Sequence, residues 1–394
     1  MHTIYLDNNA TTRPCDEAVA AATDALTACW HNPSSMHRPG QAARAKVELA
    51  RQSVARLVGA RPNEIVFTSG AAESLRLAIV GLLRSRGRGG RNVVVTSPIE
   101  HTAIRELLEA LEREGACDVR QARVGRDGVI DHANIGELLD ENVALVVMQW
   151  ANNETGAIQP VRAIGAACRE AGVPFLCDGA QVVGKLPVNV KESSVDLLAC
   201  SAHKFHGPKG AGALWIRKGV RFPPVAPGAQ EQGRRGGTEN VPGIAGMGAA
   251  ADVALRWLAD DSNRTRVAQL RDDFEQAVLE RCLGAVVNGP MAPSDRLWNT
   301  ANIGFPRLEA EALLILLSEK GVCASAGAAC SSGSLDPSPV LLAMGVPEAI
   351  AHGSLRFSLS RWTTREEVER AVDIVAASAT QLSASLPTPI ATVR

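Results

Sequence analysis

Lys204 is the first residue that could do chemistry, because it follows an apolar, strand-like run in the segment SAHKFHGPKGAG. A lysine held at the end of a strand can form a Schiff base with a carbonyl compound. A solvated surface lysine would give the same local pattern. The interpretation of Lys204 therefore depends on the residues that accompany it.

Asp178 is the second candidate, at the end of the apolar run VPFLCD. An unpaired carboxylate at this position would be costly, so we expect a cationic partner. A protonated pyridine nitrogen is a suitable partner, since an aspartate keeps such a ring protonated and able to accept electrons.

The segment IVFTSGAAES, residues 65–74, runs from a strand through small residues into a helix. This arrangement directs backbone N–H groups and the helix dipole toward an anion, so it predicts a phosphate cradle. An ordinary strand-to-helix turn is the alternative interpretation.

Cys330 lies in the segment CASAGAACSSGSLDPS, which has few bulky side chains. Such a composition predicts a loop that can move, and movement is what a carrier thiol needs. From composition alone, a buried cysteine in a turn of small residues is the alternative. We interpret Cys323, at the start of the same segment, as structural.

The elements that must position these residues alternate between residues 60 and 217. The β-rich runs EIVFTS, NVVVTS, ALVVMQW, VPFLCD and VDLLACS are separated by helical patterns such as IRELLEALERE and VRAIGAACREA. This alternation predicts βαβ units around a mostly parallel sheet, whose ligands gather at the carboxyl ends of the strands. A helical pattern from about Ile244 to Leu279 breaks near Asp260, and a smaller α+β region follows. We place the domain boundary near residue 255.

Composition narrows the location and the partners. The chain has 394 residues with 41 basic and 42 acidic side chains, so its net charge of −1 predicts no attraction to nucleic acid or membrane lipid. Its nine cysteines form an odd set without a CxxC pair, which fits reduced thiols better than disulfides or zinc.

His203 and His206 are spaced like metal ligands, but no nearby carboxylate or thiol completes a set, and we expect no metal. Without a leader or membrane segment, we expect a cytoplasmic protein.

With the phosphate turn, the aspartate and the lysine in this order, the chain resembles the class V aminotransferase-like branch of fold type I pyridoxal-phosphate (PLP) enzymes. More narrowly, it is similar to the NifS/IscS cysteine desulfurases over nearly its whole length. The matching segments are YLDNNATT, HNPSSMHRPG, FTSGAAES, EHTAI, ANNETG, CDGAQ, SAHKFHGPKG, RRGGTENVPG, ASAGAACSSGS and SLRFSLSRWTT.

The resemblance implies the α/β fold of fold type I PLP-dependent transferases, with a mostly parallel seven-stranded sheet. The large PLP-binding domain would span residues 15–255. Residues 1–14 and 256–394 would form a small α+β domain that carries the catalytic cysteine loop. The family is homodimeric, with its active sites at the subunit interface.

The resemblance also implies how PLP is held. Lys204 would carry the cofactor as a Schiff base, Asp178 would pair with the pyridine nitrogen, and His101 would stack on the ring and shuttle protons. Gln181 and Asn153 would hydrogen-bond the side of the ring that bears the phenolic oxygen. The residues implied for the phosphate are Ala71, Ala72, Ser201 and His203, with Thr238 reaching the phosphate of the neighbouring subunit. We interpret the basic pair Arg234 and Arg235 as part of a loop near the cofactor phosphate or a dimer contact rather than as a nucleic-acid patch.

The reaction implied is the removal of sulfur from L-cysteine, giving L-alanine and a persulfide on Cys330. Arg356, helped by Asn32, would bind the substrate carboxylate, for which a guanidinium fork is well shaped. The persulfide sulfur would pass to an acceptor such as an iron–sulfur scaffold protein. That acceptor would transiently share an iron–sulfur cluster ligated by Cys330.

Two positions depart from the family pattern. The phosphate turn usually reads GATES, and Ala72 replaces the threonine whose hydroxyl would contact the phosphate. The missing hydrogen bond would cost about 1 kcal/mol or somewhat more in cofactor binding. Ser360 stands where glycine is usual, and this change touches no predicted catalytic group.

Two other functions stay open from the sequence. The first is a related PLP lyase or aminotransferase that acts on another amino acid, including selenocysteine. Cys330 and its loop of small residues argue against it, because a pure aminotransferase would not need that thiol. A sulfur-relay scaffold with decayed catalysis is suggested only by Ala72, and the intact Lys204, Asp178 and His101 argue against it. The segment RRGGTENVPG and the short C-terminal tail favour the nitrogen-fixation NifS branch over the housekeeping one, but the sequence does not determine the acceptor.

Overall fold

The computed structural model describes residues 3–85, 90–327 and 336–385, so Cys330 and its immediate neighbours lie outside the described residues. The chain divides into two compact units. The larger unit comprises Thr11–Asn153 and Ala157–Asn263, and the smaller unit comprises Met1–Ala10, Glu154–Gly156 and Arg264–Arg394. The predicted domain boundary near residue 255 stays a prediction.

A seven-stranded sheet forms the centre of the larger unit, with strand order β2-β8-β7-β6-β5-β3-β4. Only β8 runs antiparallel to its neighbours, so the predicted mostly parallel seven-stranded sheet is confirmed. Every strand except β4 is buried along its whole length, as expected for a parallel sheet covered on both faces. The strands are β2 (Ile65–Thr68), β3 (Val93–Thr96), β4 (Asp118–Gln121), β5 (Val143–Gln149), β6 (Phe175–Asp178), β7 (Leu197–Ser201) and β8 (Gly212–Ile216).

Helix α3 (Ala71–Ser85) covers the centre of this sheet, where it packs against β2, β5, β6, β7 and β8. Its apolar side chains recur every three or four residues and form one buried stripe, namely Leu75, Ala78, Ile79 and Leu82. This burial fixes the helix against the sheet, and with it the turn that precedes the helix at the end of β2.

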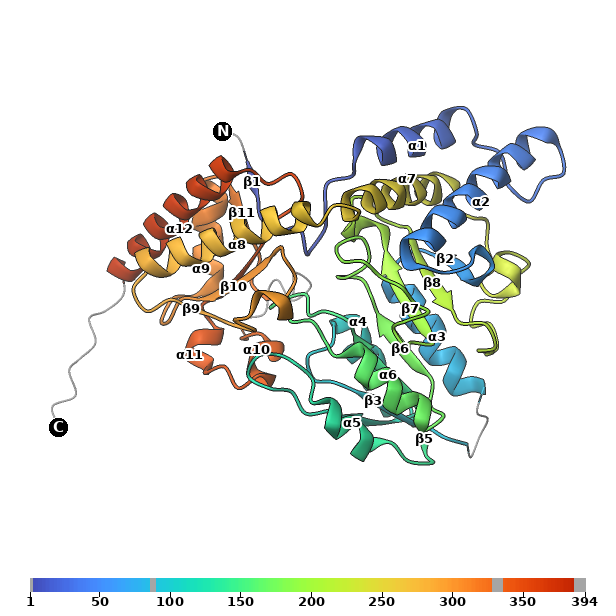
Figure 1. The fold of residues 1–394 in the computed structure, drawn as a ribbon, viewed down its shortest axis with the longest axis horizontal. Helices are drawn as coiled ribbons and strands as arrows, with labels where there is room; N and C mark the ends of the chain where they lie inside the picture. The colour runs from blue at the N-terminus through green and yellow to red at the C-terminus, as the bar shows by residue number, and fades with distance from the viewer. Residues whose placement is uncertain (1–2, 86–89, 328–335, 386–394) are drawn as a thin grey trace. The chain divides into compact units, whose positions relative to one another are not determined.

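The other helices of the larger unit fall into two groups. Helices α1 (Asp16–Thr27) and α2 (Arg38–Val58) pack against α7 (Val241–Leu258) and lie beside it in Figure 1. Helix α4 (Thr102–Arg113) contacts α3, and α5 (His132–Leu138) contacts α6 (Val161–Glu170). Three short 3-10 helices, η1 (Pro62–Glu64), η2 (Ala202–Lys204) and η3 (Glu231–Gly233), complete this unit.

The smaller unit has an α+β composition, as expected. Strand β1 (Ile4–Tyr5) pairs in parallel with β11 (Val322–Cys323), and β9 (Val286–Val287), β10 (Thr300–Gly304) and β12 (Ser354–Ser358) form an antiparallel sheet with β10 in the middle. Phe274 and Phe357 pack with their ring centroids 4.9 Å apart. The helices are α8 (Asp261–Arg281), which begins in the larger unit, α9 (Ala310–Glu319), α10 (Pro339–Ala343), α11 (Glu348–Ala351) and α12 (Arg365–Ser385), together with the 3-10 helix η4 (Pro293–Asp295).

The five predicted β-rich runs correspond to β2, β3, β5, β6 and β7, and the predicted helical break near Asp260 is confirmed by the end of α7 at Leu258 and the start of α8 at Asp261. Strand β8 was not among the predicted β-rich runs. Gly212, its first residue, lies opposite both Thr68 of β2 and Ser201 of β7. A Cβ atom there would lie 2.4 Å from the Cα of Gly70, so only glycine allows β8 to run this close to the turn after β2.

A buried ion pair anchors the loop that contains η3. Both terminal nitrogens of Arg51 lie 2.8 Å from the carboxylate oxygens of Glu231, which also accepts the N–H of Phe67 at 2.7 Å. Glu231 and Gln232 have φ values of 47° and 59°, a backbone region that non-glycine residues adopt only when their contacts compensate the strain. The ion pair therefore holds the chain in this conformation ahead of the segment RRGGTEN.

Replacing Arg51 by methionine should destabilise the larger unit, because the Glu231 carboxylate would stay buried without its cation. We expect a loss of about 3 kcal/mol, measured as a lower urea midpoint of unfolding for the variant. The matched control is Arg56→Met, since Arg56 pairs with Asp252 at the surface with a side chain that is 57% exposed. An exposed pair contributes at most about 1 kcal/mol, so equal losses in the two variants would contradict the anchoring role.

Candidate active site

The carboxyl ends of three adjacent strands bring the predicted site residues together in the larger unit. Gln149 ends β5, Asp178 ends β6 and Ser201 ends β7, and Gln149 is the register partner of Asp178. Side chains at this edge of an open α/β sheet face the space where ligands bind. The βαβ pattern of the sequence was sufficient to predict this edge.

Asp178 is a buried carboxyl group, with 7% of its surface exposed. Its Oδ1 accepts the N–H of Ala180 at 2.9 Å. Burial raises the pKa of Asp178 above its usual value, although the Ala180 N–H and the charge of Lys204 both oppose this rise. A cation placed against Asp178 would therefore interact more favourably with it than with an exposed carboxylate.

Lys204 is half-buried and ends η2, directly after β7. Thr12 stabilises this turn, because both its N–H and its hydroxyl donate to the carbonyl of His203, at 2.8 and 2.9 Å. The Thr12 hydroxyl also accepts the N–H of His206 at 2.7 Å. These bonds give Thr12, the last residue of the segment YLDNNATT, a structural role that no sequence pattern indicated.

The turn between β2 and α3 is the segment in which the sequence predicts an anion cradle. The N–H of Ala71 donates to the Ser201 hydroxyl at 2.7 Å, which leaves the hydroxyl hydrogen of Ser201 to donate elsewhere. Ala71 is buried and Ala72 is exposed at the first turn of α3. The Ser201 hydroxyl therefore lies at the N-terminus of α3, where the helix dipole is positive. The Ala71 N–H itself is used by Ser201.

Glu73 links this turn to the loop of η3. One of its oxygens accepts the N–H of Ser69 at 2.6 Å, and the other accepts Nε of Arg235 at 2.9 Å. Although burial raises the pKa of Glu73, the hydrogen bonds from Arg235 and Ser69 hold it below its usual value. Arg235 is thereby held beside the turn after β2, and its predicted place near the cofactor phosphate stays a prediction.

His203 is a partly buried histidine in a cationic environment. Its Nδ1 lies 3.2 Å from the Thr11 hydroxyl. Burial, followed by the charges of Lys204, Lys209 and Lys185, lowers the pKa of His203 to about 4. His203 is therefore neutral near pH 7, and the positive potential around it favours an anionic ligand.

His101 is the N-cap of α4, and its Nδ1 accepts the N–H of Ala103 at 3.1 Å. This bond assigns the hydrogen of the neutral ring to Nε2. His101 is half-buried.

Glu100, the residue before His101, has a role that sequence reasoning missed. It is 1% exposed, and its Oε1 accepts the Ser97 hydroxyl at 2.5 Å. Within the part of the chain that the structure describes, its Oε2 has no hydrogen-bond partner. Burial raises the pKa of Glu100 to about 8, and the nearby charge of Asp178 adds to this rise. A carboxylate directly before His101, in the matching segment EHTAI, was the available signal.

Gln181 and Asn153 are both buried, at 5% and 7% exposure. Gln181 follows β6 in the same turn as Asp178, and its Oε1 accepts Nζ of Lys185 at 2.6 Å. Lys185 is itself 4% exposed and was not identified from the sequence. A buried lysine four residues after a predicted site residue was the signal that could have found it.

Asn32 and Thr238 lie in exposed loops of the larger unit. The side chain of Asn32 accepts the N–H of Ser34 at 2.8 Å, in the loop between α1 and α2. Thr238 follows Gly237 and precedes α7. Neither residue belongs to the strand-end cluster of Asp178, Lys204 and Ser201.

Arg356 lies on β12 in the smaller unit and is 1% exposed. Its Nη2 donates to Oδ1 of Asp7 at 2.7 Å, and its backbone exchanges two hydrogen bonds with Ser325. The guanidinium is therefore held in a fixed orientation. Cys330, the predicted nucleophile, lies outside the described residues.

In the described parts of the chain, no cluster of three or more histidine, cysteine or acidic side chains could hold a metal ion. No helix in the described ranges has the length and apolarity to cross a bilayer. The cysteines at eight described positions are free thiols, as the odd number and the missing CxxC pair predicted.

Comparison with known proteins agrees with this geometry. The family Aminotransferase class-V matches residues 4–371. A cysteine desulfurase of Cereibacter sphaeroides is 44% identical over 98% of both chains, and the cysteine desulfurase NifS of Azotobacter vinelandii is 44% identical over 94% of this chain and 91% of that one. A solved NifS-like protein superposes with a TM-score of 0.88 and 33% identity, covering 98% of this chain and all of the other.

The chain belongs to the class V aminotransferase family, whose members use pyridoxal phosphate. Within that family its relatives are cysteine desulfurases of the NifS type, and the selenocysteine lyase alternative is not favoured. The predicted family, fold and cofactor are thereby confirmed.

The donor set of the larger unit fits PLP. Asp178 is a buried carboxyl group that gains from a cationic ring nitrogen, and Lys204 offers an amine close enough to affect its pKa. The lysines around His203 and the first turn of α3 favour a phosphate group. Charge and hydrogen-bonding capacity thus match the three polar parts of the cofactor.

Replacing Glu100 by glutamine should change how stability depends on pH. With a pKa of about 8 in the folded protein against 4.5 in the unfolded chain, Glu100 binds a proton on folding between these values. The protonated Glu100 therefore contributes fully to the free energy of unfolding below pH 4.5. This contribution to stability is lost as the pH rises through 8, by up to about 1.4 kcal/mol per pH unit.

We expect the stability gain of Glu100→Gln over the native protein to grow from pH 5 to pH 8, measured by thermal unfolding of the PLP-free protein. The control Glu114→Gln, at an exposed position, should show no such trend. A difference that stays constant with pH would contradict a protonated Glu100.

Proposed function

We propose that this protein is a cysteine desulfurase, which converts L-cysteine and the Cys330 thiol into L-alanine and a Cys330 persulfide. The carbon–sulfur bond of the substrate breaks and a sulfur–sulfur bond forms on Cys330. The observation that carries the proposal is a buried Asp178 beside Lys204, in a chain that is 44% identical to a cysteine desulfurase over 98% of its length.

The strand-end cluster would bind the cofactor. Bound PLP withdraws electrons from the α-carbon of the amino acid, which primes the bond to sulfur. The amine of Lys204 holds the cofactor and then takes the α-proton of the substrate. Asp178 keeps the pyridine nitrogen protonated, because a buried carboxylate stabilises a neighbouring cation strongly.

The remaining polar residues would orient the ring and the phosphate. His101 stacks on the ring and passes protons at Nε2, and Gln181 and Asn153 hydrogen-bond the side that carries the phenolic oxygen. The phosphate is held by the first turn of α3 and the end of β7, through Ala71, Ala72, Ser201 and His203. Because His203 is neutral, it can donate to or accept from the phosphate without an added charge.

Cys330 would act as the nucleophile and carrier. Its thiolate attacks the substrate sulfur, and His101 accepts or returns the thiol proton. Among the cysteines in the described ranges, Cys168 and Cys200 are unsuited to this role, because burial raises the pKa of each thiol to about 12.

Arg356 would bind the substrate carboxylate, assisted by Asn32. The ion pair with Asp7 supports this proposal, because it holds in one orientation a guanidinium whose planar fork matches a carboxylate.

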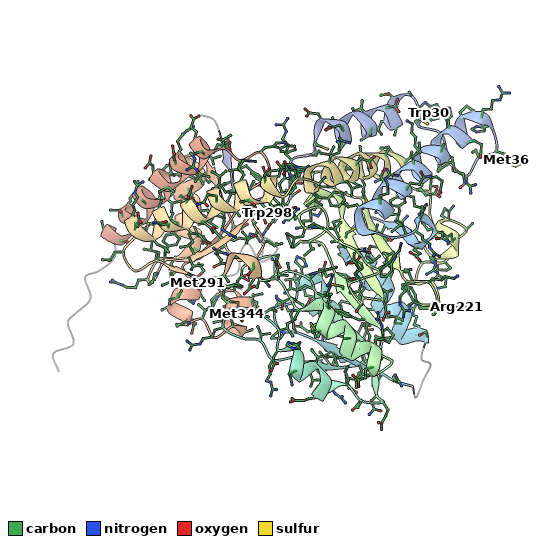
Figure 2. All side chains as sticks on the ribbon, in the orientation of Figure 1. Trp30, Met36, Arg221, Met291, Trp298 and Met344 are labelled. Carbon is green, nitrogen blue, oxygen red and sulfur yellow. The ribbon has the colours of Figure 1, made fainter. Side chains whose placement is uncertain are left out.

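We also propose that the protein is a homodimer in which Thr238 reaches the phosphate of the partner subunit. Large apolar side chains on the surface of the larger unit support a dimer: Trp30 is 68% exposed and Met36 94% exposed, on either side of Asn32. Figure 2 shows both side chains at the connection between α1 and α2. Such a patch of apolar side chains suggests an interface.

We further propose that the acceptor is an iron–sulfur scaffold protein in the cytoplasm, serving nitrogen fixation as in the NifS branch. The similarity to the NifS protein of Azotobacter vinelandii supports the branch. The free thiols support a reducing compartment. The acceptor would share an iron–sulfur cluster with Cys330 during transfer.

Cys330→Ala should abolish desulfuration and leave PLP binding intact. We expect the native protein to release alanine and sulfide in equal amounts from L-cysteine in the presence of a reductant, and the variant to release neither. The visible absorbance of bound PLP should persist in the variant. Turnover that is unchanged in Cys330→Ala would reject the carrier role, and the absence of PLP absorbance in the native protein would reject the enzyme class.

Arg356→Lys should weaken substrate binding, since lysine keeps the charge but loses the bidentate fork. A loss of about 1.5 to 3 kcal/mol corresponds to a KM for L-cysteine that is roughly 10- to 150-fold higher, with a smaller change in kcat. The matched control is Arg361→Lys, at another buried arginine of the smaller unit. Equal effects on KM in both variants would contradict a specific role for Arg356.

A further inference from the structure

Lys185 is a buried lysine that contacts a residue of the candidate cofactor site. It is 4% exposed, and its Nζ donates to Oε1 of Gln181 at 2.6 Å. Gln181 is 5% exposed and follows Asp178 in the turn after β6. Burying an ammonium group is costly, so its placement beside a site residue requires a physical reason.

The contact fixes which way the Gln181 amide points. An ammonium group has three donors and no acceptor, so only the amide oxygen can face Lys185. The two ends of a glutamine amide are otherwise nearly equivalent in shape, and either can face a ligand. With its oxygen bound to Lys185, Gln181 presents its NH₂ group on the opposite side and can only donate there.

The backbone of this turn holds both residues in place. The N–H groups of Val182 and Val183 donate to the carbonyl of Gly179 at 3.0 and 2.9 Å, and the N–H of Lys185 donates to the carbonyl of Val182 at 2.9 Å. Gln181 and Lys185 therefore lie four residues apart on a turn that is closed by its own hydrogen bonds.

Gly184 packs this turn against the segment of Lys204. Its φ is +80°, and a Cβ atom there would lie 2.3 Å from the Cβ of Phe205, the residue after Lys204. The charge of Lys185 also contributes to the lowered pKa of His203. Lys185 therefore lies near the elements that carry both the amine and the predicted phosphate ligand.

We propose that Lys185 is a positioning residue that holds Gln181 as a hydrogen-bond donor to the phenolic oxygen of PLP. A donor at this oxygen favours its deprotonated form, and an acceptor would favour the protonated form. Lys185 thereby lowers the pH at which the bound cofactor loses its proton. This inference rests on the proposed function, because it requires that PLP occupies the site.

The test is a pH titration of the absorbance of bound PLP in the full-length protein, without L-cysteine. Lys185→Met should raise the pKa of the spectral transition by about one unit, and Lys185→Arg, which keeps a charged donor, should restore it toward the native value. The matched control Lys209→Met removes an exposed charge that also acts on His203 but has no recorded contact with Gln181. This control should shift the transition much less.

A double-mutant cycle separates positioning from a direct effect of charge. In a Gln181→Ala background, Lys185→Met should shift the transition by less than about 0.3 unit, because the amide that it orients is gone. The same shift in both backgrounds, or no shift in either, would overturn the proposal.

Gln181→Glu provides a test that keeps Lys185. The new carboxylate should pair with Lys185, leave the melting temperature near that of the native protein and raise the pKa of the transition, because it offers no donor to the cofactor. An unchanged transition in this variant would overturn the proposal even if Lys185→Met did not fold. A native protein without PLP absorbance would instead count against the proposed function.

Discussion

The carboxyl group of Asp178, buried at the end of β6, is the constraint on which the site depends. Removing a carboxylate from water costs several kcal/mol unless a cation or hydrogen-bond donors replace the solvent. The structure supplies one backbone donor at Ala180 and the charge of Lys204, yet the pKa of Asp178 stays above its usual value. The site therefore retains a capacity to bind a further cation, and the protonated pyridine nitrogen of PLP has the required charge.

Positive charge on the other side of the site balances an anion. Lys204, Lys209 and Lys185 together act on His203, and Arg235 is bound to Glu73 beside the phosphate turn. This arrangement bears on Ala72, which stands where the family pattern has a threonine that would hydrogen-bond the phosphate. Several charges near the phosphate can offset the loss of a single neutral bond, because electrostatic attraction does not require one fixed geometry.

Two buried carboxyl groups, Glu100 and Asp178, share this region and cannot both ionise at low cost. With a pKa that burial raises to about 8, Glu100 is protonated near pH 7, so Asp178 does not face a second buried negative charge from it. Glu100 directly precedes His101, so this protonated carboxyl group and the proposed proton-transfer residue lie in one short segment.

The sequence by itself determined the βαβ alternation, the strand-end positions of Asp178 and Lys204, and the turn before α3, because these follow from local hydrophobic patterns and turn residues. It also determined the family, since matching segments extend from YLDNNATT to SLSRWTT. Tertiary structure decided the rest. Thr12 braces His203, Asp7 orients Arg356, and Arg51 anchors Glu231 across separations of up to 349 residues, which no local pattern encodes. The protonation of Glu100 and the amide orientation of Gln181 likewise depend on burial and on neighbours that only the folded chain brings together.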